Sequence, residues 1–233
     1  MSAAATAAAD DIRPVYIASR SDLERTFATM MPFFESKESE HNWLNREQSM
    51  IKIRGLIVSG AHRQFGEAFF VSHLKTVQEG ILKCVASLRT TLSMHAVHLV
   101  QELAIELGDD LAPCVEAFLI HLTGMAGFTK KLIANATQEA AAAIMVNVSF
   151  RPLYLQLIWQ GIQDKNVATR TAAAEHLCTV LNHHAAHRKH AVESHGGLDL
   201  LDKSLRKGVG DSNPAARTKG REAFWIFHRY WPD

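Results

Sequence analysis

The chain has 233 residues, of which 47% are hydrophobic and 21% charged, so it can bury a core and general disorder is excluded. Its 25 Lys and Arg residues balance 24 Asp and Glu residues, and a formal net charge of +1 excludes a globally basic nucleic-acid-binding protein. No apolar run approaches the roughly 18 residues that a membrane helix needs, so we expect neither nucleic acid nor membrane as a partner.

The first segment is rich in alanine. Residues 1–11 have neither a basic start nor a Leu-rich stretch, so they do not resemble a signal peptide. We therefore expect a disordered leader over residues 1–11, followed by a single domain over residues 12–233.

Apolar residues recur at three- and four-residue spacing along the rest of the chain, with few Gly and Pro residues between them. One such stripe includes Leu74, Val77 and Ile81, and another ends at Gly108, a helix stop signal. No segment shows the sustained alternation of a half-buried strand. The pattern predicts an all-α protein.

The predicted helices form five antiparallel pairs. The first helix is expected to begin at Ser21, because Glu24 three positions later completes a capping box. A unit of two helices repeated on the order of every 40 residues is typical of a HEAT-repeat α-solenoid. The pairs are expected at 21–34 with 43–59, 65–86 with 89–107, 111–125 with 129–148, 151–162 with 166–187, and 190–208 with 213–231.

Basic side chains recur in the short loops inside these pairs, or directly after them. Equivalent loops of stacked helix pairs align along one edge, so the sequence predicts a basic rim with one aromatic residue at its end. Such a rim suits an acidic protein surface, and exposed Trp and Arg residues often anchor such interfaces. The rim candidates are Trp43, Arg46, Arg89, Lys130, Lys131, Lys165, Arg170, Arg217 and Arg221.

The four tryptophans divide into two groups. Trp43 follows a run of polar residues at a helix start and is expected to be exposed. Trp159, Trp225 and Trp231 fall within or at the end of helical stripes, which predicts core or capping aromatics. A Trp43 side chain that pointed into the core would weaken the rim interpretation.

No pattern in the sequence indicates catalysis. GxSxG, P-loop and HExxH motifs are missing, so we expect no enzyme and no cofactor. Cys84 with His73 or His95 could form a dyad, but nothing in the sequence orients it. Cys84, Cys114 and Cys178 match no disulfide framework or metal pattern and are expected to be buried thiols.

A histidine-rich tract lies late in the chain. His183 and His187 are spaced to share a zinc ion on a helix, but the neighbouring Arg188 and Lys189 would oppose a cation. We therefore expect a solvated, pH-sensitive turn rather than a metal site. The histidines concerned are His183, His184, His187 and His190.

Several segments resemble a TOG domain of the CLASP family, and together they cover nearly the whole chain from about residue 12. Residues 34–47 read FESKESEHNWLNRE, similar to the family's Lys-Glu-x-Glu-x-Asn-Trp-x-x-Arg-Glu string. Residues 51–61, IKIRGLIVSGA, also resemble the family, and residues 216–225, ARTKGREAFW, resemble its basic helix with an aromatic finish. The lead-in VYIASRSDLE at 15–24 is most similar to the second TOG domain of these proteins.

The resemblance implies a flat or arched paddle that binds tubulin or microtubules through the rim candidates, with Lys130 and Lys131 as alternatives in the third loop. Early repeats would meet β-tubulin and later ones α-tubulin. It also implies that the domain suppresses microtubule catastrophe and promotes rescue, in the cytoplasm, on the cytoskeleton and at the mitotic spindle. Kinetochore or other spindle proteins would be further partners. The alternative is a HEAT-repeat adaptor that binds a non-tubulin acidic protein or peptide.

Overall fold

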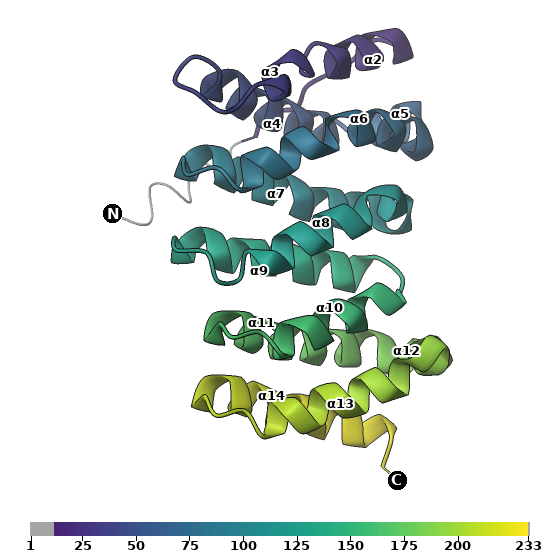
Figure 1. Cartoon of the computed structure of the whole chain (residues 1–233). Helices are drawn as coiled ribbons and strands as arrows, with labels where there is room; N and C mark the ends of the chain where they lie inside the picture. The colour runs from purple at the N-terminus through teal and green to yellow at the C-terminus, as the bar shows by residue number, and fades with distance from the viewer. Residues whose placement is uncertain (1–11, 233) are drawn as a thin grey trace. The chain divides into compact units, whose positions relative to one another are not determined.

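The computed structural model describes residues 12–232, which consist of helices and connecting loops without a strand (Figure 1). The all-α prediction is therefore confirmed. The expected leader, residues 1–11, lies outside the described residues. Within the described part, none of the helices combines the length and apolarity that crossing a bilayer requires.

The chain divides into two compact units, one up to Phe118 and the other from Leu119. The boundary falls within helix α8 (Ala112–Gly124). Each unit is built from helix pairs that pack their apolar faces together. That residues 12–233 act as a single domain stays a prediction.

The first unit begins with a helix that the sequence predicts as one piece and the structure divides in two. Pro32 occupies the first turn of the second piece, where its missing N–H costs nothing, whereas inside a continuous helix it would break the hydrogen-bond ladder. The helices of this unit are α2 (Arg20–Ala28), α3 (Pro32–Glu35), α4 (Trp43–Val58), α5 (Ala61–Phe65), α6 (Glu67–Val85) and α7 (Thr90–Leu107).

The start of α2 differs from the predicted capping box. Ser19, not Ser21, is the N-cap, since its Oγ accepts a hydrogen bond from the backbone N–H of Asp22 at 3.1 Å. The prediction at Ser21 is therefore wrong by two residues. The predicted stop at Gly108 is confirmed, because this residue ends α7 with a φ of +51° that favours glycine.

The second unit continues the pairing of a longer helix with a shorter one. Its apolar core includes Leu155, Leu177 and Leu201, each from a different helix. After part of α8, the helices are α9 (Lys131–Asn147), α10 (Pro152–Ile162), α11 (Val167–Val180), the π-helical turn η2 (Leu181–Ala185), α12 (Ala186–Glu193), the 3₁₀ turn η3 (Ser194–Gly196), α13 (Gly197–Val209) and α14 (Pro214–Tyr230).

Two boundaries predicted in the second unit are wrong. The helix expected over 166–187 leaves α-helical geometry after Val180, and the helix expected from residue 190 begins at Gly197. The intervening backbone is irregular: Arg188 has non-helical angles, and His195 adopts a left-handed φ of +53°. These residues therefore form a connection between the fourth and fifth pairs.

The helices of the fifth pair approach each other closely through two glycines. A Cβ atom on Gly220 of α14 would lie 2.4 Å from the carbonyl carbon of Gly208 in α13. Only residues without a side chain permit this backbone contact. The crossing fixes the loop between the two helices, residues 210–213, which carries part of the candidate site.

Candidate functional site

Trp43 lies at the surface of the first unit but is less exposed than the sequence predicts. It is the first residue of α4 and is half-buried, with the guanidinium carbon of Arg89 4.8 Å from its ring centroid. The preceding loop is held by Asn42, whose side chain accepts from the backbone N–H of Ser39 and donates to the carbonyl of Lys37. This loop therefore positions the ring with one face under a cation.

Arg89 connects two loops of the first unit. Its side chain is 32% exposed and forms ion pairs with Glu38, at 3.4 Å, and with Glu40. We call Trp43, Arg89, Glu38 and Glu40 the Trp43 cluster. The two carboxylates together more than offset the positive charge of a residue that the sequence presents as a free basic rim position.

Arg46 follows Trp43 by three residues in α4 and is only 2% exposed. Its Nε donates to the carbonyl of Phe33 at 2.9 Å, and its Nη2 donates to the carbonyl of Ser36. Buried guanidinium groups require such partners, and here they tie α4 to the turn that follows α3. Burial makes Arg46 a positioning residue for the loop rather than a surface contact.

Two loops of the second unit share a pattern, Asp-x-Asn-x-x-x-Arg, at 164–170 and 211–217. In both loops the Asp side chain accepts from the backbone N–H of the Asn, at 2.7 and 2.8 Å. The Asn side chain then caps the following helix. The Arg folds back onto the loop and donates to carbonyl oxygens within it. The pattern thus specifies a closed loop before α11 and α14.

The two arginines of this pattern serve the loops themselves. Arg170 is 14% exposed and pairs with Asp211 of the next loop, with 2.7 Å between Nε and Oδ2. This hydrogen bond raises the pKa of Arg170 and lowers the pKa of Asp211. Arg217 is half-buried and donates to the carbonyls of Asp211, at 2.6 Å, and Ser212, at 3.1 Å. Both arginines order these loops, and Lys165 lies in the first of them.

The remaining rim candidates are exposed cations of the second unit. Lys165 lies in the 164–170 loop, and Gly127 of the preceding loop packs against Asn166 beside it. Neighbouring loops are therefore side by side within this unit, as they are around Arg89 in the first. A rim that runs through both units stays a prediction. The exposed cations are Lys130, Lys131, Lys165 and Arg221.

Trp225 is the clearest departure from the predicted aromatics, because it is 63% exposed instead of buried. The buried positions of α14 are Ala216, Gly220, Ala223 and Ile226, which follow the helical period and leave residue 225 on another face. The spacing of these buried residues in the sequence could have predicted that Trp225 is exposed. Trp231 is the C-cap residue of α14, as predicted, whereas Trp159 is only half-buried.

One residue of the histidine tract is buried in the structure, although the sequence predicts a solvated turn. His184 is buried, and its Nε2 lies 2.6 Å from the carbonyl oxygen of Met145, so the expectation of a solvated turn is wrong for this residue. Over residues 12–232, no three His, Cys, Asp or Glu side chains gather in a way that could hold a metal ion.

The cysteines are buried free thiols, as the sequence predicts. Burial raises the pKa of Cys84 to about 12, so this thiol has little nucleophilic thiolate at neutral pH. The proposed dyad partners have other contacts: Nδ1 of His95 lies 3.0 Å from Nη1 of Arg54, and Nδ1 of His73 lies 2.9 Å from the carbonyl oxygen of Phe69. The geometry gives no support to a Cys–His nucleophile.

Comparison with known proteins agrees with the resemblance seen in the sequence. The profile of the family described as CLASP N terminal matches residues 23–233. Protein STU1 of Mycosarcoma maydis is 90% identical over 230 residues, which cover 99% of this chain and 18% of that protein. Protein STU1 of Cryptococcus neoformans (strain JEC21) is 44% identical over 225 residues, covering 96% and 18%. Protein stu-1 of Neurospora crassa is 38% identical over 223 residues, covering 96% and 20%. The chain therefore spans about a fifth of the length of these relatives.

Proposed function

Because the chain belongs to the CLASP N-terminal family, we propose that it is a tubulin-binding domain of a microtubule regulator. The family consists of non-enzymatic microtubule-associated proteins, and membership confirms that the domain is not an enzyme. In our proposal the domain stabilises microtubules by suppressing catastrophe and promoting rescue. It acts in the cytoplasm on the cytoskeleton and the mitotic spindle, with kinetochore or other spindle proteins as further partners. Its assignment to the second TOG domain stays a prediction.

The placement of Trp43 carries the proposal. A large aromatic ring at the surface, fixed by a hydrogen-bonded loop and stacked under Arg89, is the kind of anchor that dominates protein interfaces. Its position at the start of α4 leaves it outside the core that stabilises the fold. The ring and the guanidinium would together contact β-tubulin.

The exposed cations of the second unit would provide the electrostatic attraction to an acidic partner. The backbone carbonyl of Lys165 accepts a hydrogen bond from Arg170, which holds this loop closed and so keeps Lys165 in place. Charges of this kind raise the association rate more than the final affinity. In our proposal they contact α-tubulin. The residues are Lys130, Lys131, Lys165 and Arg221.

The test compares the half-buried Trp43 with the exposed Trp225. Trp43→Ala should weaken binding to unpolymerised tubulin at least tenfold, measured by co-elution and by titration of labelled tubulin. It should change the free energy of unfolding by less than about 1 kcal/mol, because the ring is not part of the core. Trp225→Ala is the matched control and should leave tubulin affinity unchanged.

Two results would contradict the proposal. Equal losses in the two variants would show that any exposed tryptophan matters, through non-specific association. Normal binding by a Trp43→Ala variant that unfolds early would make Trp43 a structural residue. Co-pelleting of the wild-type domain with stabilised microtubules, measured in parallel, separates preference for the lattice from preference for free tubulin.

A further inference from the structure

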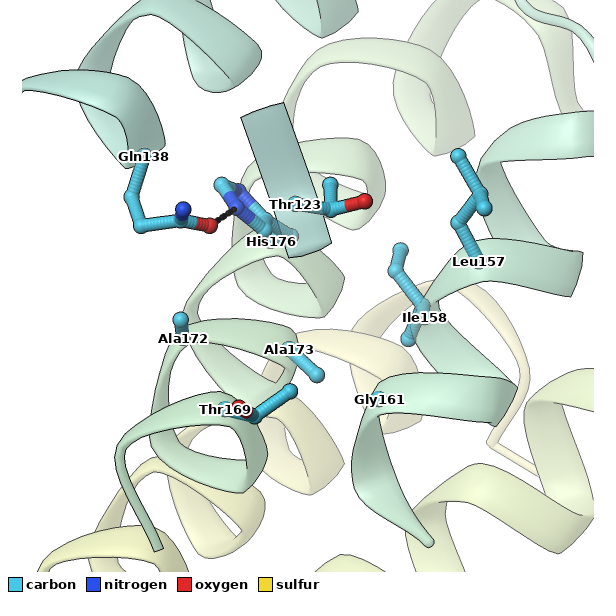
Figure 2. Close-up of a pocket in the computed structure, with 9 residues that line it drawn as sticks. All are labelled: Thr123, Gln138, Leu157, Ile158, Gly161, Thr169, Ala172, Ala173 and His176. Carbon is cyan, nitrogen blue, oxygen red and sulfur yellow. Dashed lines mark hydrogen bonds between the residues drawn. The ribbon is translucent and has the colours of Figure 1, made fainter. Parts of the chain in front are cut away.

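A groove of about 580 Å³ runs between α9 and α11 in the second unit. The two helices lie side by side in the same direction, because Gly127 contacts Asn166 just before they begin and Gln138 contacts His176 two turns later (Figure 2). None of the exposed rim cations except Lys131 lines it. The lining residues include Lys131, Gln138, Glu139, Ala172, Glu175 and His176.

The dimensions of the groove suit an extended chain. Its α9 wall extends from Lys131 to Ala142, three helical turns or about 16 Å at 1.5 Å per residue. An extended polypeptide covers that length with about five residues. The lining includes small side chains, among them Ala168 and Ala172, which let a second backbone approach closely.

The groove has one buried polar side chain, His176, which is only 4% exposed. The amide nitrogen of Gln138 donates to the carbonyl of Leu122 at 2.7 Å, so the amide oxygen is the atom that faces His176, at 2.9 Å from its Nε2. That oxygen can only accept, and Nε2 must therefore carry the ring proton. Nδ1 is then an acceptor, and no described residue donates to it.

The ring of His176 lines both the groove and a small neighbouring cavity. This cavity measures about 20 Å³ and is bounded by Thr123, Leu157 and Ile158 on the side away from Gln138 (Figure 2). Burial lowers the pKa of His176 to about 4, which keeps the ring neutral and Nδ1 unprotonated at physiological pH. His176 is therefore suited to accept a hydrogen bond from an N–H group rather than to bind an anion.

The charges of the groove are unevenly distributed. Lys131 lies at the first residue of α9, whereas Glu139 and Glu175 lie two turns further along their helices, next to Gln138 and His176 respectively. Glu139 is exposed and has no ion pair among the described residues, and the ion pair of Glu175 with Lys219 is long, at 4.0 Å. The centre of the groove is therefore acidic in an otherwise nearly neutral chain.

We propose that this groove binds an extended segment of a partner protein that carries Lys or Arg at its centre. The basic side chain pairs with Glu139 and Glu175, a backbone N–H of the segment donates to Nδ1 of His176, and the alanines accommodate its backbone. The groove belongs to the second unit, whereas the Trp43 cluster belongs to the first, so the two sites share no residue. It would let the domain hold a second, basic partner.

The test uses the peptide acetyl-Gly-Ser-Lys-Arg-Ser-Gly-amide and the whole chain labelled with ¹⁵N. Addition of the peptide should shift the amide resonances of residues 135–142 and 168–179 and move the Nδ1 resonance of His176. The corresponding peptide with two Glu residues in place of Lys-Arg should shift neither. Glu139→Lys with Glu175→Lys should weaken binding of the basic peptide at least tenfold, because both attractive charges become repulsive.

Glu116→Lys is the matched control, since Glu116 is an exposed carboxylate outside the groove, and it should leave binding unchanged. Equal binding of the acidic peptide, shifts confined to other helices, or an unmoved Nδ1 resonance would each overturn the proposal. So would a loss of binding free energy in the Glu116→Lys variant that is about half that of the double variant. One reversal changes the net charge half as much as two, so such a loss would indicate only a general response to net charge.

Discussion

The contacts of Arg89 hold its guanidinium in a position from which it can bind an acidic residue of a partner. Its guanidinium lies over the ring of Trp43 and faces two carboxylates, of which Glu40 is mostly exposed. Ion pairs at such exposed positions contribute little to stability because water and salt screen them. An acidic residue of a partner can therefore replace Glu40 at Arg89 at small energetic cost, while the cation–π contact keeps the guanidinium in place.

Removing the charge of Glu40 should make this exchange easier. We expect Glu40→Gln to increase tubulin affinity about two- to fivefold, with stability unchanged within about 0.5 kcal/mol. Titration of labelled tubulin at 0.05 and 0.15 M salt measures the effect, which should shrink at the higher salt. Glu24→Gln, an exposed carboxylate in α2, is the control. Unchanged or weaker binding in Glu40→Gln would mean that Glu40 does not compete with the partner.

His176 also makes stability depend on pH. Its folded-state pKa of about 4 lies below the ordinary value of 6.5, so the unfolded chain binds the proton more tightly. Stability is therefore retained above pH 6.5 and falls as the pH decreases toward 4. The contribution of this residue amounts to about 2 kcal/mol between pH 7 and pH 5.

Chemical denaturation at pH 7 and pH 5 checks this expectation. The wild type should lose about 2 kcal/mol more than His176→Gln over that interval, because the amide does not titrate. Other buried histidines with lowered pKa values, such as His62 and His121, titrate equally in both proteins and cancel in the comparison. Equal losses in the two proteins would contradict the assignment.

At the scale of helices, regular apolar spacing in the sequence was sufficient to predict a helix. Segments whose backbone is irregular could not be predicted in this way. The helix expected over 65–86 is found at Glu67–Val85, since its buried residues follow one period. The connection at 181–196 escaped prediction because its histidines carry no such period and its direction depends on the left-handed His195. Of the basic rim candidates, Arg89, Lys130 and Lys165 lie outside the helices, and the others lie within helices.

What the rim residues contact could not be predicted, because those contacts cross between elements. The sequence places Arg170 directly after a loop but does not reveal that Asp211, 41 positions later, neutralises it. Likewise, the proximity of Glu40 to Arg89 depends on how the first two helix pairs pack. The spacing of α14, by contrast, was sufficient to place Trp225 off the buried face.

The close contact of Gly208 and Gly220 between α13 and α14 predicts how a substitution in α14 changes stability. Gly220→Ala should destabilise the protein by about 1–3 kcal/mol, although alanine favours helix, because its Cβ would collide with the backbone of Gly208. Gly124→Ala in α8 is the matched control, since a Cβ there meets nothing within 4 Å. The control should be neutral or stabilising by up to about 1 kcal/mol. Thermal denaturation compares them, and equal effects would show that the helices can separate at little cost.

At the scale of the whole molecule, the local groups of charges determine which partners are attracted, more than the net charge does. The chain carries a net charge of only +1, yet its loops present cations in both units and its α9–α11 groove presents carboxylates. Screening limits each charge to a range of about 8 Å at physiological salt, so partners respond to the nearest group of charges. One nearly neutral domain can therefore attract an acidic partner at its loops and a basic one at the groove.

The two units offer a test of whether tubulin contacts both. Trp43 belongs to the first unit and Lys165 to the second, and the two side chains share no partner among the described residues. Lys165 is a better choice than Arg217 for charge reversal, because it is exposed and its side chain does not hold the loop. If both units contact tubulin, Trp43→Ala should weaken binding at least tenfold and Lys165→Glu about three- to tenfold.

Such separate contacts should contribute independently, so the double variant should lose the sum of the two free energies within about 0.5 kcal/mol. Titration of labelled tubulin with all four proteins measures this. The contribution of Lys165 should also decrease as salt is raised, because its contact is long-range and charged. The contribution of Trp43 should change little, because its contact is mainly packing. A Lys165→Glu change without effect in either background would confine the tubulin interface to the first unit and leave the cations of the second unit to another partner.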